Sequence, residues 1–192
     1  MNNPHVYVIS GPTAVGKGTV VRALQDLVPE LFVSISATTR PPRPGEIDGV
    51  HYYFVSDSVF DELVETDGLL EWARVHNVAR YGTPRDSVAE ALAEGKNVIL
   101  EIDLQGARQV RETLPEAIHI FLAPPTWGEL LNRLRGRGTE TEQQIEQRLA
   151  TAEFELKQQE EFDHVIVNDE LSDTVQQLVD LMGLHPTKKV VS

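Results

Sequence analysis

The sequence predicts an α/β fold in which a doubly wound parallel sheet carries helices on both of its faces. Short apolar runs rich in β-branched residues, such as Val6–Ile9 and Asn97–Asp103, are typical of buried strands. Stretches with apolar residues at helical spacing follow these runs along the chain. Because strands that alternate with helices form a parallel sheet with right-handed crossovers, we expect one α/β core within the 192 residues.

The first strand leads into a glycine-bearing turn and then into a helix. The turn spans residues 11–16, and Val20 and Leu24 indicate a helix that Pro29 ends. In this arrangement successive backbone N–H groups can face an anion at the positive end of the helix dipole, and Lys17 adds a point charge. The segment predicts a phosphate-binding cradle, and an ordinary turn with a solvated lysine is the alternative.

This cradle matches the P-loop pattern G-x-x-x-x-G-K-[ST] except at its last position. Gly18 stands where the pattern has a hydroxyl residue, and Thr19 follows it. Since Gly18 has no side chain, either Thr19 substitutes as a ligand of Mg²⁺ or the metal keeps more of its water, which Mg²⁺ tolerates well.

We expect residues 34–83 to form a small β-rich insertion between two βα units of the core. We expect strands in residues 31–36 and 50–55, and Ser56 or Asp57 caps a short helix after them.

A stiff loop over residues 38–46 separates these two strands. Its proline and glycine content excludes a helix or a central strand. Such a loop can present Arg40 and Arg43 to an anion with little entropy left to lose. A proline-rich surface turn with two solvated arginines is the alternative.

We expect the core to consist of residues 1–33 and 84–192 and to include a lid at about residues 133–158. The lid is predicted because the glycine-hinged run Gly136–Gly138 lies among arginines, and the alternative is a solvated helix whose glutamates pair with them.

The remaining predicted elements of the core alternate between helices and strands. They are a helix opened by Thr83 and Pro84, a strand at 97–103, helices at 105–113 and after Thr126, a strand at 118–122, a long helix capped by Thr139 or Thr141, a strand at 165–167 and a helix at 171–182.

Acidic residues end the strand at 97–103. If this strand lies beside the first strand, Glu101 and Asp103 come close to bound phosphates and their metal ion. Acids that only end a strand or cap the next helix are the alternative.

The composition excludes several classes of function. The chain has no cysteine, which excludes disulfides and thiolate catalysis, and its net charge of −13 argues against nucleic acid or an anionic membrane as the main partner. It also lacks a basic, apolar leader and any run of 18 apolar residues, so we expect a soluble, cytoplasmic protein. Arginines nevertheless cluster in three places, which suggests a local anionic ligand: Arg40 with Arg43; Arg74, Arg80 and Arg85; and Arg133, Arg135, Arg137 and Arg148.

Several longer motifs resemble the guanylate kinase family. They extend over nearly the whole chain in the family's order and spacing. The matching runs are Ser34–Glu46, Gly49-x-x-Tyr52-x-Phe54-Val55, Glu71-Trp72-Ala73, Tyr81-Gly82-Thr83, Ile102-Asp103-Leu104-Gln105-Gly106, Gly136–Thr141 and Ile166–Asp169.

The resemblance implies transfer of the γ-phosphoryl group of ATP to GMP, giving ADP and GDP with Mg²⁺, in purine nucleotide metabolism and GMP recycling. It makes residues 34–83 a GMP-binding insertion, and it implies a monomer or a homodimer. It assigns Arg40, Arg43, Tyr52 and Tyr81 to the GMP phosphate, and Ser36, Glu71, Thr83 and Asp103 to guanine. It assigns Gly11, Pro12, Thr13, Ala14, Val15, Gly16, Lys17, Gly18, Thr19 and Asn168 to ATP, and Lys17, Arg133, Arg137 and Arg148 to the transferring group.

Two other functions compete with this interpretation. A related domain that binds peptides instead of nucleotides would be expected to lose the cradle, whereas Gly11, Gly16 and Lys17 are intact. A small-molecule kinase with another acceptor would be expected to lose the base-reading acids, whereas Glu71 and Asp103 are present.

Overall fold

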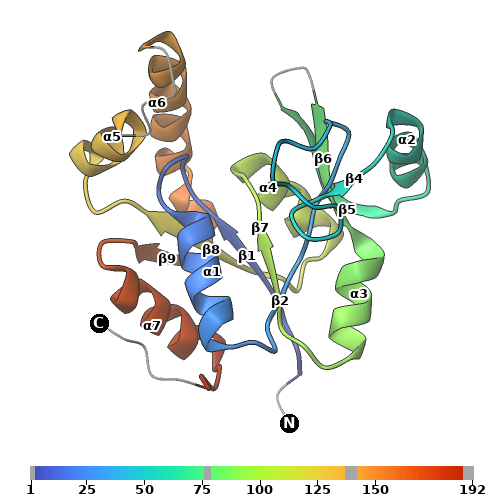
Figure 1. Cartoon of the computed structure of the whole chain (residues 1–192). Helices are drawn as coiled ribbons and strands as arrows, with labels where there is room; N and C mark the ends of the chain where they lie inside the picture. The colour runs from blue at the N-terminus through green and yellow to red at the C-terminus, as the bar shows by residue number, and fades with distance from the viewer. Residues whose placement is uncertain (1–2, 76–78, 137–141, 188–192) are drawn as a thin grey trace. The chain divides into compact units, whose positions relative to one another are not determined.

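A computed structural model describes residues 3–75, 79–136 and 142–187 of the chain (Figure 1). The chain divides into two compact units. Unit 1 comprises Met1–Tyr7 and Phe32–Ala117, and unit 2 comprises Val8–Leu31 and Ile118–Ser192. Within the described residues, no helix combines the length and the apolar character that a membrane crossing requires.

The main sheet has five strands in the order β2-β7-β1-β8-β9. Neighbours β2 and β7 pair in parallel, as do β8 and β9. This parallel sheet, whose strands alternate with helices along the chain, confirms the α/β fold class. The strands are β1 (Val6–Ser10), β2 (Phe32–Val33), β7 (Val98–Glu101), β8 (Ile118–Ala123) and β9 (His164–Val167).

Unit 2 carries the glycine-bearing loop and the helices that follow β1, β8 and β9. Helix α1 (Lys17–Leu27) lies beside α7 (Leu171–Met182), as Figure 1 shows. Helix α5 (Trp127–Arg135) begins where the Thr126 side chain accepts a hydrogen bond from the backbone of Glu129, as the sequence predicted. It packs on α6 (Glu142–Lys157), and a short 3₁₀ turn, η1 (Gln159–Glu161), follows. The contact between α5 and α6 is apolar and buries Leu130, Leu134 and Ala152.

Unit 1 contains a second sheet, whose strands lie between Ala37 and Pro84. Its strand order is β4-β3-β6-β5, and its core holds Ala37, Phe60 and Leu69. The second sheet consists of β3 (Ala37–Thr38), β4 (Tyr53–Phe54), β5 (Leu69–Val75) and β6 (Ala79–Pro84), and the unit's helices are α2 (Asp57–Glu65), α3 (Arg85–Ala93) and α4 (Leu104–Thr113).

Two strands of unit 1 are shorter than the sequence predicted. The run 31–36 contributes only Phe32 and Val33 to the main sheet, because the chain then crosses to the second sheet at Ala37. The run 50–55 contributes only Tyr53 and Phe54, since the chain turns around Gly49 in a conformation with positive φ just before them.

Two local interpretations also change. Helix α3 begins at Arg85 with Pro84 as its N-cap, so Thr83 is not the cap that the sequence predicted. The buried Arg80 side chain pairs with Asp57 at 2.7 Å and with Asp61, which ties α2 to β6. The counterions of Arg80 are thus residues of the same unit, and Arg80 has a structural role.

Candidate active site

The loop between β1 and α1 forms an anion cradle by virtue of its backbone. Gly11 and Gly16 have φ values of +147° and +100°, and a Cβ atom on Gly11 would lie 2.3 Å from the carbonyl oxygen of Leu122. Gly16 is the N-cap of α1, so the positive end of the helix dipole lies at the loop. The Lys17 ammonium donates to the carbonyl oxygens of Gly11 (2.5 Å) and Pro12 (3.3 Å), which holds its charge over the loop.

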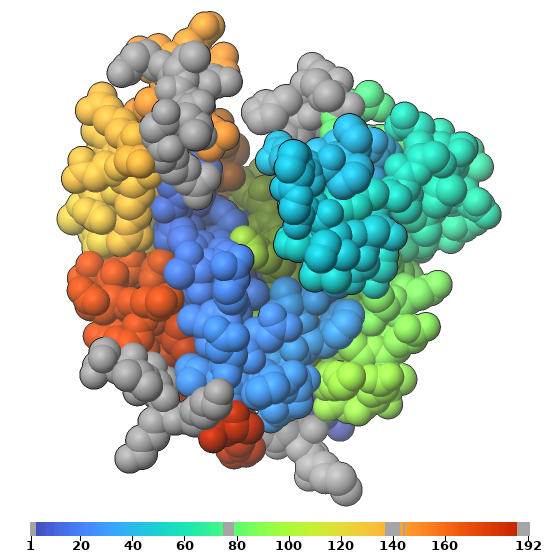
Figure 2. Space-filling model, viewed as in Figure 1, coloured from blue at the N-terminus to red at the C-terminus, as the bar shows by residue number. Residues whose placement is uncertain are grey.

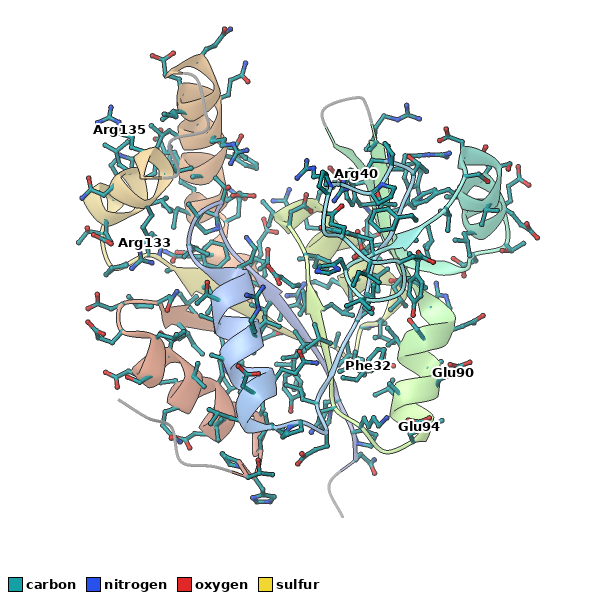
Figure 3. The ribbon with its side chains drawn as sticks, in the orientation of Figure 1. Phe32, Arg40, Glu90, Glu94, Arg133 and Arg135 are labelled. Atoms are coloured by element: carbon teal, nitrogen blue, oxygen red, sulfur yellow. The ribbon has the colours of Figure 1, made fainter. Side chains whose placement is uncertain are left out.

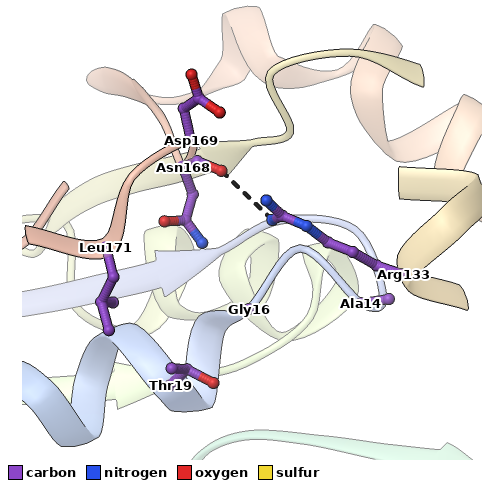
Figure 4. A pocket seen from close by; sticks show the side chains of 7 residues that line it. All are labelled: Ala14, Gly16, Thr19, Arg133, Asn168, Asp169 and Leu171. Carbon is purple, nitrogen blue, oxygen red and sulfur yellow. Dashed lines mark hydrogen bonds between the residues drawn. The ribbon is translucent and has the colours of Figure 1, made fainter. Parts of the chain in front are cut away.

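A pocket of about 330 Å³ adjoins this loop within unit 2 (Figure 4). Its wall combines backbone from the loop, a hydroxyl, an amide, a guanidinium, a carboxylate and an apolar side chain. Such a mixture suits a flat heteroaromatic ring with polar edges. The lining residues are Ala14, Gly16, Thr19, Arg133, Asn168, Asp169 and Leu171.

Asn168 ties the loop to the segment after β9. Its buried amide donates from Nδ2 to the carbonyl oxygen of Val15 at 2.7 Å, and its Oδ1 accepts from the Thr174 hydroxyl at 3.0 Å. A Cβ atom on Gly16 would approach the same amide nitrogen to 2.8 Å, so the glycine permits this close packing. Asn168 thus shapes the pocket wall with its side chain.

The predicted lid arginines differ in their surroundings. Arg133 donates from Nη1 to the carbonyl oxygens of Val15 and Asn168, each at 3.3 Å, and from Nε to Glu129 at 3.0 Å. Arg133 and Arg135 leave different sides of α5, and Arg135 is exposed (Figure 3). Arg148 is half-buried on α6. Arg137 lies outside the described residues.

Unit 1 gathers a second cluster around Arg40, in the segment after β3. The guanidinium donates to both carboxylate oxygens of Glu46, at 2.6 and 2.7 Å, and from Nε to the Tyr81 hydroxyl at 2.9 Å. It also lies 5.0 Å from the ring centroid of Tyr52 and stacks near Phe54. The rings and the carboxylate fix a cation that would otherwise be mobile.

The surroundings of this cluster are exposed. Arg43 is exposed, and its backbone N–H donates to Glu46 at 2.7 Å. Figure 2 shows the cyan segment around residues 40–60 on the surface of unit 1. The hydrogen bonds from Arg40 hold the pKa of Glu46 down at about 2, so this carboxylate stays ionised. Ser36 is half-buried, and its carbonyl oxygen accepts from the backbone of Tyr53 at 3.0 Å.

Unit 1 also holds a buried acid on β5. Glu71 on β5 is 6% exposed, and its Oε1 accepts from the Thr83 hydroxyl at 2.7 Å. Burial raises the pKa of Glu71 to about 7, and the charge of Asp103 adds to the rise while the Thr83 hydroxyl opposes it. Asp103 caps α4 by accepting from the Gly106 N–H at 2.8 Å. Asp103 therefore caps α4 with one carboxylate oxygen, which does not exclude a further role.

Sequence reasoning missed Glu46 as a site residue. It is the first acid after the proline-rich run, and its position six residues beyond Arg40 was the available signal. The motifs assign Arg40 to a ligand, and they do not reveal that Glu46 is its internal counterion.

No group of three or more His, Cys, Asp or Glu side chains gathers as a metal site in the part of the chain that the structure describes. The loop offers a hydroxyl at Thr19 and no side chain at Gly18. This donor set fits a divalent cation that is bound chiefly by phosphate oxygens and water, as Mg²⁺ commonly is.

Comparisons with known proteins agree on one family. A sequence model described as guanylate kinase matches residues 3–184. The guanylate kinase of Cutibacterium acnes is 61% identical over 179 residues, which cover 93% of this chain and 90% of that protein. The guanylate kinase of Nocardia farcinica is 57% identical, with 92% of each chain covered. A crystal structure of guanylate kinase from Anaplasma phagocytophilum is 31% identical with a TM-score of 0.74, and the match covers 96% of this chain and 87% of that one.

Proposed function

We infer the function from the family and the geometry together: the chain belongs to the guanylate kinase family, and it is an ATP:GMP phosphotransferase. It transfers the γ-phosphoryl group of ATP to GMP, giving ADP and GDP, in purine nucleotide metabolism and GMP recycling. The observation that supports the assignment best is the match over residues 3–184, which includes both the glycine-bearing loop and the acids of unit 1.

We propose that the phosphate of GMP binds to the cluster around Arg40. Two arginines and two tyrosines provide forked guanidinium donors and hydroxyl donors, which suit the tetrahedral dianion. The contacts of Arg40 with Tyr52, Tyr81 and Glu46 support this role, because they orient the guanidinium in advance. The proposed ligands of the phosphate are Arg40, Arg43, Tyr52 and Tyr81.

We propose that guanine is recognised by Ser36, Glu71, Thr83 and Asp103. Guanine offers N1–H and its 2-amino group as adjacent donors, so a carboxylate can accept from both. Adenine has an acceptor at N1 and no 2-amino group, and it would leave the buried Glu71 carboxylate unpaired. A site built on such buried groups can discriminate by several powers of ten.

We propose that ATP binds along residues 11–19 and in the adjoining pocket. The backbone N–H groups of the loop would hold the β- and γ-phosphates, and Lys17 would reach them with its ammonium group. The pocket beside Asn168 would take the adenosine part of ATP. Because the Asn168 side chain bonds to Val15 and Thr174 and its N–H bonds to the Ala123 carbonyl oxygen, its contribution to the nucleotide would come mainly from its backbone carbonyl oxygen.

The kinases of this family are nucleotide kinases that need a divalent metal, and we propose that this metal is Mg²⁺. It would bind through the phosphates and water, with Thr19 as the loop hydroxyl that can join them. When bound, the cation neutralises charge on the phosphate oxygens.

We propose that Lys17, Arg133, Arg137 and Arg148 stabilise the transferring group. The GMP phosphate is already an anionic nucleophile, so the transfer requires positioning and charge neutralisation rather than a general base. A lid at about residues 133–158 would exclude water from the γ-phosphate, and residues 34–83 would close as a GMP-binding insertion.

ATP and GMP are the substrates that the family implies. We propose further that nucleic acid and membranes are not partners, since a surface with net charge −13 repels polyanions. A cytoplasmic location and a monomeric or homodimeric state complete the proposal.

The decisive experiment measures ADP formation from ATP and Mg²⁺ with GMP, AMP, CMP and UMP offered separately. Turnover that depends on GMP and collapses in Lys17→Ala would support both the cradle and the acceptor. Turnover with none of the four nucleotides, from folded protein, would contradict the kinase activity.

A further inference from the structure

One face of α4 holds the free edge of β5 through the strand's backbone. The Gln109 side chain donates from Nε2 to the carbonyl oxygen of Trp72 at 2.9 Å, and its Oε1 accepts from the Trp72 N–H at 3.0 Å. One turn later, the Thr113 hydroxyl donates to the carbonyl oxygen of Leu70 at 2.7 Å. Since β5 is an edge strand of its sheet, these side chains occupy the positions that a further strand would otherwise fill.

Glu71 lies between the two backbone positions that α4 holds. On its other side β5 pairs with β6, where Leu69 faces Pro84 and Glu71 faces Thr83. Between these two pairs β5 has one residue more than β6, so Leu70 is the extra residue of a β-bulge. A bulge re-aims the neighbouring side chain, and here its carbonyl is the one that Thr113 binds. The direction of the Glu71 carboxylate therefore depends on a local distortion that α4 maintains.

The same face of α4 also approaches the carboxylate itself. Gly106 precedes Gln109 by three residues, so the two lie on one side of the helix. A Cβ atom on Gly106 would lie 2.9 Å from Oε2 of Glu71. The N–H of Gly106 binds Asp103, the second acid of the proposed base site. One helix thus carries one acid at its N-cap and fixes the strand that bears the other.

We propose that Gln109 is a positioning residue for guanine recognition, which holds Glu71 in register with Asp103 by pairing with the backbone of Trp72. This inference rests on the proposed roles of Glu71 and Asp103 toward the base. Guanine's two donors lie side by side on one rigid edge, so the acids match them only at a fixed mutual position. Loosening β5 should weaken GMP binding and leave ATP binding unaffected.

The test compares Gln109→Leu with the wild type in steady-state kinetics. The leucine keeps the bulk of the side chain but removes both bonds to Trp72. We expect the KM for GMP to rise on the order of 10- to 100-fold, because a small misplacement of a recognition group costs that much. The KM for ATP should not change. Gln176→Leu is the matched control, since among the residues that the structure describes this helical glutamine bonds only to Asp180 of its own helix, at 2.8 Å.

A pH profile separates positioning from general loss of structure. Burial raises the pKa of Glu71, so a loosened β5 that admits water should lower the pKa seen in the acid limb of log(kcat/KM) for GMP. If Gln109→Leu does not fold, Gln109→Glu replaces it, because this variant keeps an acceptor for the Trp72 N–H and should raise the KM for GMP less steeply.

Glu71→Gln, measured in parallel, distinguishes the ways in which the proposal can fail. A wild-type KM for GMP in both Gln109 variants, with a large rise in Glu71→Gln, would overturn the positioning role and leave the base site intact. Equal increases in KM for GMP and ATP would also overturn it. An unchanged KM for GMP in Glu71→Gln would instead remove the proposed role of Glu71 in base recognition.

Discussion

Acidification from pH 8 to pH 6 should weaken GMP binding by about tenfold through one side chain, Glu71. Burial raises the pKa of Glu71 to about 7, and only the ionised carboxylate can accept from both guanine donors. The apparent Kd equals the intrinsic Kd divided by the competent fraction, and therefore scales as 1 + 10^(pKa − pH). With a pKa of about 7, this factor is about 1.1 at pH 8 and about 11 at pH 6.

Titration calorimetry of GMP at pH 6, 7 and 8 tests this dependence, with Glu71→Gln as the reference. The phosphate of GMP takes up its second proton at about pH 6, and this protonation affects binding to the wild type and to Glu71→Gln alike. The ratio of their Kd values therefore isolates Glu71. At pH 8 the variant should bind on the order of 10- to 100-fold more weakly, since hydrogen bonds to a charged group are lost. This deficit should shrink about tenfold by pH 6. A Kd ratio that stays constant across the three pH values would refute the reasoning.

Three further predictions concern stability and phosphate binding. In the folded state the pKa of Glu71 is about 7, against 4.5 in the unfolded chain. The protonated Glu71 side chain therefore stabilises the folded state fully below pH 4.5, and this stabilisation is lost as the pH rises through 7. Urea unfolding should show Glu71→Gln gaining about 3 kcal/mol relative to wild type between pH 4.5 and pH 8, and a pH-independent difference would contradict this. Gly11→Ala should lower the free energy of unfolding by more than about 2 kcal/mol in thermal melts, because the added Cβ would meet the Leu122 backbone. Gly95→Ala is the control: Gly95 also has a positive φ but has open space around it, so this variant should lower the free energy of unfolding by only about 1 kcal/mol. Glu46→Gln should raise the KM for GMP about tenfold with the KM for ATP unchanged, and a fall in the KM for GMP would mean that Glu46 competes with the phosphate.

Local signals in the sequence predicted the elements that depend on short-range contacts. Helix α7 spans the predicted Leu171–Met182, Thr126 caps α5 as predicted, and Ser56 is the one of the two predicted caps, Ser56 and Asp57, that caps α2. The loop at residues 11–16 was recognisable from its glycines. Gly11 and Gly16 have positive φ and lie close to neighbouring atoms, which other residues tolerate poorly. Capping and turn chemistry act within a few residues, so the sequence alone exposes them.

The short strands and the role of Gln109 could not be predicted in the same way. The run at 31–36 has one apolar pattern, but only Phe32 and Val33 pair in the main sheet, and the chain joins the second sheet at Ala37; the partners at Val98 and Tyr53 decide where these strands lie. Gln109 bonds to Trp72, 37 residues earlier in the chain, through backbone atoms that every residue type possesses. Nothing in the sequence distinguishes such a glutamine from one that is exposed on a helix.

Asp103 shows why the bland and the functional interpretations of one residue need not exclude each other. Its Oδ1 accepts from the N–H of Gly106, and a carboxylate offers a second oxygen that can accept from a base. The cap also fixes the direction in which that second oxygen points, since the first is bound to the helix backbone. A carboxylate that was only solvated would have to be ordered when the base binds, at a cost in entropy. Capping α4 therefore prepares Asp103 for the guanine contact that we propose.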